Sequence, residues 1–217
     1  MTAKERSPAP PPAQPPEHPD VEILGAETGF ARHLKVEIVR FRHRLFAGGW
    51  SGERVFDVVR RGAAVGVVLY DPEQDSVVLV EQFRVAALYA GRSPWQVEAV
   101  AGLVDTDETP EEVARREVRE EAGLDTIGAL LPIQCMMPAC GSFDEAVWLF
   151  CGRVDSRNAG GIHGLAEEHE DIRVTVKTIP EIERMLDAGQ IESSHSLISL
   201  YWLLRHRERL RREWPGG

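Results

Sequence analysis

The segment from Thr109 to Gly123 constrains this chain more than any other, because signals for both ends of a helix occur in it. Thr109-Pro110-Glu111-Glu112 has the form of a capping box, in which the threonine and the second glutamate bond each other's backbone N–H groups. Pro110 suits the first helical position, and Gly123 suits the left-handed residue that ends a helix. The sequence therefore predicts a helix of about three turns between these residues.

Two acidic residues of this helix fall on the face that should be buried. At about 100° per residue, Val113, Ala114 and Val118 form an apolar stripe, and Glu117 and Glu121 lie inside it. Carboxylates one turn apart on a half-buried face repel each other, and burial adds a desolvation penalty. A hard divalent cation with oxygen ligands, Mg²⁺ or Mn²⁺ in its place, would offset both effects. We therefore predict a metal site here rather than a solvated acidic face.

Arg116 has a partner on the same helix. It projects away from the apolar stripe and precedes Glu120 by four residues, the spacing at which opposite charges meet on a helix surface. This pairing leaves Glu117 and Glu121 without an evident side-chain partner, which favours the cation further.

The remaining sequence predicts three parts. Residues 1–20 are proline-rich and have little to bury, which indicates a disordered tail. Residues 21–61 contain three strand-like stretches and predict a small antiparallel sheet. Residues 62–217 predict a catalytic domain of mixed α/β (α+β) class, with strands at 63–70, 76–82, 130–136, 146–154 and 172–178 and helices from Pro180 and over 194–212.

The last of these helices is expected to bury a stripe on one side. Four apolar residues recur at helical spacing along it, and we expect them to face the core: Leu197, Ile198, Tyr201 and Leu204.

Charge and cysteine content exclude several classes of function. The formal net charge is −10, which argues against a nucleic-acid or anionic-membrane partner, because such partners favour a basic face. The three cysteines, Cys135, Cys140 and Cys151, form no disulfide framework, so we expect small buried hydrophobes in a reducing compartment. The sequence contains no membrane-length apolar run and no signal-peptide pattern, so we expect a cytoplasmic protein.

The spacing of the helix residues resembles the Nudix box. Gly102 and Glu108 are separated by five residues, and after seven more come Arg116-Glu117-Val118, any residue, Glu120-Glu121, any residue and Gly123-Leu124. Every constrained position of the box is matched. The resemblance implies the Nudix fold, which is a mixed β-sheet sandwiched between helices. It also implies attack by water on a diphosphate linked to another group, usually in a nucleoside diphosphate derivative.

The resemblance also assigns roles to residues of the box. It implies that Glu117 and Glu121 are metal ligands and that the carbonyl oxygen of Ala101 is a further ligand. Glu120 would support these ligands, and Arg116, oriented by the carboxylates, would have a structural role.

Over roughly residues 21–214 the chain is similar to the bacterial ADP-ribose pyrophosphatase branch. The similarity lies in FRHRLF (41–46), VEQFR (80–84), VAGLVD (100–105), GIHGLAEEHEDIRV (161–174) and the closing segment 199–214. It implies hydrolysis of ADP-ribose to AMP and ribose 5-phosphate. It also implies a homodimer in which residues 21–61 are exchanged and complete the partner's pocket. GDP-mannose or another nucleoside diphosphate sugar is the alternative substrate. A non-catalytic ligand sensor is disfavoured because all the box acids are present.

The acidic segment 164–171 is a candidate for further catalytic groups. The resemblance implies that Glu168 is the general base and that Glu170 completes the metal site. When a loop closes over substrate, a carboxylate that it carries can take a proton from a polarised water molecule. His169 remains an alternative base, since imidazole is a common proton acceptor near neutral pH.

The resemblance further points to substrate-binding residues. Arg84 would contact phosphate, and Phe56 and His33 would sandwich the base, although the branch usually has an arginine where Phe56 stands. The candidate substrate-binding residues therefore come from three parts of the chain, namely the strand that ends at Arg84, the N-terminal sheet and the segment after the box. The complete set is Arg84, Arg61, Phe56, His33, Pro138 and Glu145.

Overall fold

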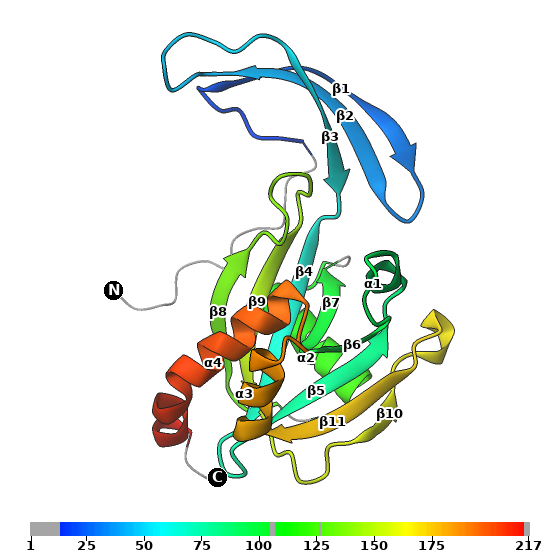
Figure 1. Ribbon diagram of the computed structural model, residues 1–217, viewed down its shortest axis with the longest axis vertical. Coiled ribbons are helices and arrows are strands. Elements are labelled where there is room, and N and C mark those ends of the chain that lie inside the picture. The colour runs from blue at the N-terminus through cyan, green and yellow to red at the C-terminus, as the bar shows by residue number, and fades with distance from the viewer. Residues whose placement is uncertain (1–13, 105–106, 126, 215–217) are drawn as a thin grey trace. The chain divides into compact units, whose positions relative to one another are not determined.

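The computed structural model describes residues 14–104, 107–125 and 127–214 (Figure 1). The chain divides into two compact units. The first runs to Ala63 and takes in Met137–Ala146, and the second comprises Ala64–Met136 and the chain from Val147 on. The segment 137–146, which the sequence assigned to the catalytic domain, thus groups with the N-terminal sheet. The predicted tail, residues 1–20, lies mostly outside the described residues and stays a prediction.

The first unit contains the expected antiparallel sheet. Its strands pair in the order β1-β2-β3, and they are β1 (Val21–Ala31), β2 (Lys35–His43) and β3 (Arg54–Arg60). Segment 137–146 is attached to the end of β3 by Asp144, whose carboxylate accepts the backbone N–H of Arg61 at 2.6 Å and that of Gly62 at 3.2 Å. Apolar side chains remain exposed on this sheet, among them Val21, Ile23, Leu24, Phe30, Val55 and Phe56.

The second unit is built on a mixed eight-stranded sheet with the order β10-β11-β5-β4-β9-β8, in which β6 pairs with β5 and β7 with β4. Its strands are β4 (Ala63–Asp71), β5 (Ser76–Phe83), β6 (Trp95–Glu98), β7 (Val100–Val104), β8 (Leu130–Met136), β9 (Ala146–Arg153), β10 (Gly161–His163) and β11 (Ile172–Thr178). The helices are α1 (Val85–Tyr89), α2 (Pro110–Ala122), α3 (Ile179–Asp187), α4 (Ser194–Glu213) and the 3-10 turn Ala166–Glu168.

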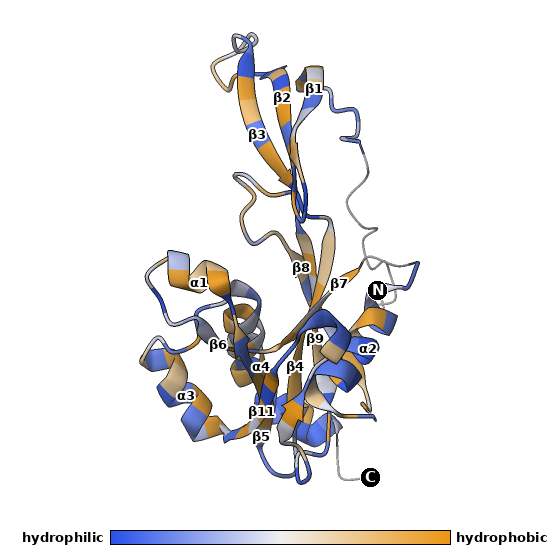
Figure 2. Ribbon diagram, turned by 90° about the vertical axis from the view of Figure 1, so that its right-hand side faces the viewer, coloured by the Kyte–Doolittle hydropathy of each residue, from blue (hydrophilic) through white to orange (hydrophobic). Residues whose placement is uncertain are grey.

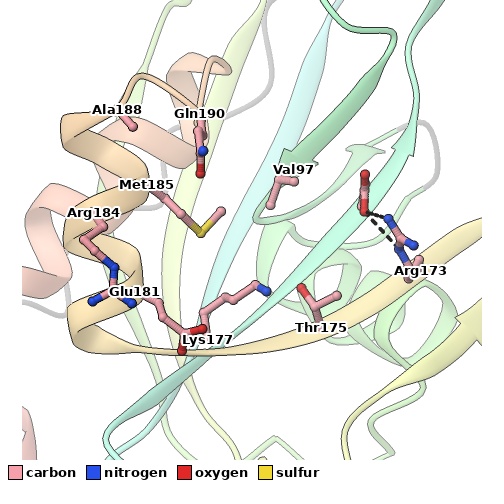
Figure 3. Close-up of a pocket in the computed structure, with 10 residues that line it drawn as sticks. Val97, Arg173, Thr175, Lys177, Glu181, Arg184, Met185, Ala188 and Gln190 are labelled. Carbon is pink, nitrogen blue, oxygen red and sulfur yellow. Dashed lines mark hydrogen bonds and ion pairs between the residues drawn. The ribbon is translucent and has the colours of Figure 1, made fainter.

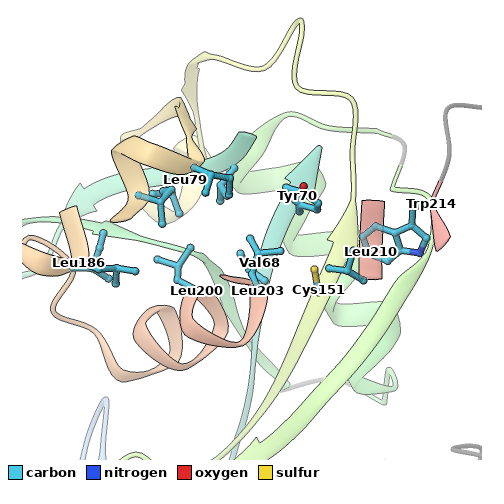
Figure 4. Packing of buried hydrophobic residues seen from close by; sticks show 13 residues of the cluster. Val68, Tyr70, Leu79, Cys151, Leu186, Leu200, Leu203, Leu210 and Trp214 are labelled. Atoms are coloured by element: carbon cyan, nitrogen blue, oxygen red, sulfur yellow. The ribbon is translucent and has the colours of Figure 1, made fainter. Parts of the chain in front are cut away.

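Helices cover both faces of this sheet, as Figure 2 shows with α2 on one side and α3 on the other. Strand alternation explains the layering, because neighbouring residues of a strand point to opposite faces. On the face covered by α3 and α4, Val68 and Tyr70 of β4 pack with residues of both helices (Figure 4). The predicted sheet between helices is therefore confirmed.

Three expectations about burial and local structure were wrong. The buried residues of α4 are Ser196, Ser199, Leu200, Leu203 and Leu210, whereas Tyr201 is 55% exposed. The prediction was wrong for Tyr201, whereas Leu197 and Leu204 pack against the main core and Ile198 packs against a smaller buried cluster. Cys151 is buried, but Cys135 and Cys140 are exposed. Gly102 lies within strand β7, not in a loop. Short elements without a periodic pattern, namely α1, β6 and β10, were not predicted.

Within the described residues, no helix combines the length and the apolar character that crossing a membrane requires.

Candidate functional site

Helix α2 has the ends that the sequence predicts. The Thr109 N–H donates to the Glu112 carboxylate at 2.8 Å, the Glu112 N–H donates to Thr109 Oγ1 at 3.3 Å, and Gly123 adopts φ 64°. Val113, Ala114 and Val118 are buried, and Glu121 is buried on the same side with 3% exposure. The expectation that acids share the apolar face of this helix is confirmed.

Glu121 is held between α2, β5 and β7 by two hydrogen bonds. Its carboxylate accepts the Ala101 N–H at 3.1 Å and the Gln82 side-chain amide at 3.3 Å. Burial raises the pKa of Glu121 to about 8, and the nearby charge of Glu117 acts in the same direction. The two hydrogen bonds and the positive charge of Arg84 compensate only in part. An ionised Glu121 therefore lacks a full counter-charge.

Glu117 lies directly over the backbone of β7. A Cβ atom added at Gly102 would sit 2.0 Å from Glu117 Cδ, so only glycine leaves room for this carboxylate. Burial raises the pKa of Glu117 to about 7, and the charges of Glu120 and Glu170 raise it further against the opposing effect of Arg116. Three carboxylates on two separate segments therefore act on one another here.

Arg116 contacts three carboxylates of the box. Its Nη1 donates to Glu117 Oε1 at 2.7 Å and to Glu120 Oε2 at 3.0 Å, and its Nε donates to Glu108 Oε2 at 3.0 Å. The predicted pair with Glu120 is confirmed. The expectation that Glu117 lacks a side-chain partner was wrong, because the Arg116 guanidinium also donates to the carboxylate of this next residue in the chain.

The acidic segment 164–171 is fastened to the C-terminal end of α2. The Gly164 N–H donates to the Glu120 carbonyl oxygen at 3.0 Å, and the Leu165 N–H donates to Glu170 Oε2 at 3.0 Å. Gly164 has φ +98°, and a Cβ there would lie 2.6 Å from Glu170 Cβ. Glu168 and His169 are exposed at the end of the 3-10 turn. The structure thus brings Glu170 to the carboxylates of α2 and leaves Glu168 facing solvent.

Arg84 lies at the end of β5 and is anchored by a residue that the sequence analysis missed. Its Nε donates to Glu98 Oε2 at 2.9 Å, and the Glu98 side chain is 7% exposed, against 41% for Arg84. Gln82, which contacts Glu121, was missed as well. The sequence pattern could have identified Gln82, since it follows Val78 and Val80 at alternate positions of a strand and should share their buried face.

The remaining candidates belong to the first unit. Arg61 and Glu145 lie close together, with Nε and Oε1 3.8 Å apart, and Pro138 is exposed in segment 137–146. Phe56 pairs with Val39 in the middle of the sheet, whereas His33 lies in the turn between β1 and β2. Phe56 and His33 are therefore not neighbours within one chain, and their joint role in base binding stays a prediction.

The donor set fits a hard divalent cation. Glu117, Glu121 and Glu170 carry oxygen atoms of the kind that such a cation binds, and burial raises the pKa of Glu117 and of Glu121, so their charged forms need a counter-charge. As they stand, no three acidic, histidine or cysteine side chains among the described residues converge on one point. Glu117 is turned to Arg116 and Glu170 to the Leu165 N–H. A bound cation would have to draw these carboxylates away from their present donors.

Gly102→Ala should lower activity without unfolding the protein. The new methyl group displaces the Glu117 carboxylate, which can move because it ends a flexible side chain. We expect a fall in kcat/KM of about 10²-fold, the order found when one group stabilising a transition state is lost. Steady-state kinetics with a thermal melt would measure this, and Gly141→Ala is the control, since a Cβ there meets nothing within 4 Å. Equal activity of both variants would contradict the expectation.

The stability of the metal-free protein should fall as pH rises. Glu121 has a folded pKa of about 8 against an ordinary value of 4.5. The folded state therefore binds more protons than the unfolded state in that window, and unfolding becomes easier by up to about 1.4 kcal/mol per pH unit. Urea unfolding with a chelator at pH 6 and pH 8 should show a smaller decrease for Glu121→Gln than for the wild type. Identical decreases would refute this explanation.

Comparison with known proteins agrees with this geometry. Residues 60–194 match the NUDIX domain. The ADP-ribose pyrophosphatase of Haemophilus influenzae is 41% identical over 198 residues, which cover 90% of this chain and 91% of that protein. The ADP-ribose pyrophosphatase of Escherichia coli K12 is 40% identical over 195 residues, covering 90% and 93%.

Two further proteins are more distant. The GDP-mannose pyrophosphatase of Enterobacter sp. (strain 638) is 33% identical over 151 residues, which cover 68% of this chain and 76% of that protein. A crystal structure of an ADP compounds hydrolase superposes with a TM-score of 0.66 at 20% identity, covering 92% of this chain and 99% of that chain. The expected fold is thereby confirmed.

Proposed function

Because this chain belongs to the Nudix family, we propose that it is a Mg²⁺-dependent pyrophosphohydrolase that converts ADP-ribose and water to AMP and ribose 5-phosphate. The observation that carries the substrate is the 41% identity to an ADP-ribose pyrophosphatase over 90% of the chain. The site supports the reaction class, since every acid of the box is present and the two that face β7 need a counter-charge.

Different residues of the second unit would take the proton, bind the phosphate and position the ligand carboxylates. Water attacks one phosphorus of the diphosphate, the bond to the bridging oxygen breaks, and the proton of the water passes to the Glu168 carboxylate. Arg84, aimed by the buried Glu98, donates hydrogen bonds to a phosphate oxygen. Arg116 holds Glu117 and Glu120 at fixed spacing, so that the ligand carboxylates are preorganised.

Glu117, Glu121, Glu170 and the Ala101 carbonyl oxygen would hold the Mg²⁺, for which Mn²⁺ can substitute. When bound, the cation neutralises charge that develops on the phosphoryl oxygens and makes water a better nucleophile. The hydrogen bond from the Ala101 N–H to the Glu121 carboxylate supports this role for Ala101, because it keeps the two residues in contact.

We also propose a homodimer in which the first unit completes a substrate pocket of the partner subunit. The three-stranded sheet exposes apolar side chains such as Phe30 at 50% and Val55 at 60%, and exposed apolar surface of this kind is typical of a protein–protein contact. Arg61, Glu145, Phe56, His33 and Pro138 would then contribute to substrate binding. All three cysteines are free thiols, which fits the reducing cytoplasm.

The experiment that tests the proposal is a product assay with purified protein and Mg²⁺. ADP-ribose should give AMP and ribose 5-phosphate with a higher kcat/KM than GDP-mannose, the alternative suggested by the 33% identical relative. Preferred cleavage of GDP-mannose would keep the mechanism and overturn the substrate. Binding of ADP-ribose without cleavage of either compound would overturn the enzyme and favour a ligand sensor.

A further inference from the structure

A cavity lies on the face of β5 opposite to the carboxylates. It measures about 630 Å³, within the size range of small-molecule sites. Its walls come from β5, β6, β11, α3 and the residues that follow α3 (Figure 3). Because successive strand residues face opposite sides, Glu81 lines this cavity whereas its neighbour Gln82 contacts Glu121. The cavity is therefore separate from the site described above.

Positive charge gathers around this cavity although the protein is acidic, with a formal net charge of −10. Arg173 is paired with Glu81, its Nε lying 2.9 Å from Oε2. Glu181 is committed to the start of α3, where its carboxylate accepts the Thr178 N–H at 2.8 Å. The charge of Glu181 also acts on Lys177 and on Arg184. One carboxylate, already bonded to Thr178, is thus shared by two cations that come from different elements and line the same cavity.

The rest of the lining is apolar with a polar edge. Val97, Met185 and Ala188 provide apolar surface, and the Met185 thioether extends between α3 and the sheet (Figure 3). Thioethers make favourable contacts with aromatic rings. Gln190 adds an amide that both donates and accepts hydrogen bonds, as the edge of a nucleobase requires.

We propose that this cavity binds a nucleoside monophosphate. Its phosphate is held by Lys177 and Arg184, and its base packs against Met185 and Val97 with its edge at Gln190. A simple anion would pair with the two cations but leave the apolar surface in water. A nucleoside without phosphate would cover the apolar surface but leave the two cations without an anion. The inference does not depend on the reaction proposed above.

The test follows the Met185 methyl group by NMR in protein labelled at the methionine methyl carbons. The chain has only four methionines, and the Met185→Leu variant assigns the signal. With a chelator present, AMP should shift the Met185 signal saturably at up to millimolar concentration. Adenosine and inorganic phosphate should each bind at least about tenfold more weakly, because each loses one part of the contact.

Two variants and a control locate the binding. Arg184→Ala and Lys177→Ala should each weaken AMP binding by about tenfold, since each removes a charged hydrogen-bond donor. Arg205→Ala, an exposed arginine of α4 outside the cavity, should bind AMP as the wild type does. An unmoved Met185 signal would overturn the proposal. Equal affinity for inorganic phosphate would overturn the nucleotide assignment, and equal effects of all three variants would overturn the placement.

Discussion

Glu117→Gln and Glu121→Gln should each lower kcat/KM for ADP-ribose by about 10³-fold, or ~4 kcal/mol of transition-state stabilisation, while the protein stays folded. Glutamine keeps the size of the side chain and removes the charge that a cation requires. The fold should tolerate the change because ionisation is unfavourable at both positions, where burial raises the pKa to about 7 and about 8. At Glu121 the amide oxygen can still accept the Ala101 N–H.

Kinetics alone would not show that the lost charge binds a cation, so metal titration must accompany it. Both variants should need more Mg²⁺ for half-maximal activity and bind Mn²⁺ more weakly in calorimetry. Glu111→Gln is the matched control on the same helix, since Glu111 is exposed and its one ion pair within the described residues is with Arg115 at 3.3 Å. If either variant kept the turnover and metal affinity of the control, its residue would not be a ligand.

The agreement between sequence and structure is closest where local chemistry decides the outcome. The ends of α2 depend on Thr109, Pro110, Glu112 and Gly123, which act within a few residues of one another. The strands of the core alternate or run apolar, and β8 and β11 have the predicted limits of 130–136 and 172–178. These features need no knowledge of distant contacts, so a single sequence can specify them.

What could not be predicted depends on partners far apart in the chain. Glu98 contacts Arg84 because β6 pairs with β5, and no pattern in the sequence around Glu98 predicts this contact. The burial of Ser196 in α4 was not predicted either, because its hydroxyl accepts the Ala99 N–H at 2.8 Å across 97 residues. The Glu117 carboxylate fits over β7 only because Gly102 has no side chain, and this contact between separate segments does not follow from the helix pattern alone. Tertiary contacts decided each of these cases.

Glu168→Gln should reduce kcat for ADP-ribose by about 10³-fold with little change in KM, because it removes a proton acceptor and no phosphate contact. Glu168 ends an exposed 3-10 turn, so the substitution disturbs no core. Its neighbour Glu170 is fixed by the Leu165 N–H, and Gly164 fixes the segment to α2. An exposed carboxylate beside an anchored one is suited to move onto substrate when the loop closes.

The rival base is His169, and its backbone permits a clean comparison. His169 has φ 58°, a left-handed conformation that asparagine tolerates, so His169→Asn removes the imidazole without straining the turn. Glu167→Gln changes the neighbouring exposed acid and serves as the control. Single-turnover rates of the three variants, measured at saturating ADP-ribose and Mg²⁺, separate the possibilities. A slow Glu168→Gln beside two fast variants would establish the Glu168 carboxylate as the base, because Glu167→Gln controls for the loss of an acid in the same turn and His169→Asn for the loss of the imidazole. A slow His169→Asn with a fast Glu168→Gln would transfer the role to the imidazole.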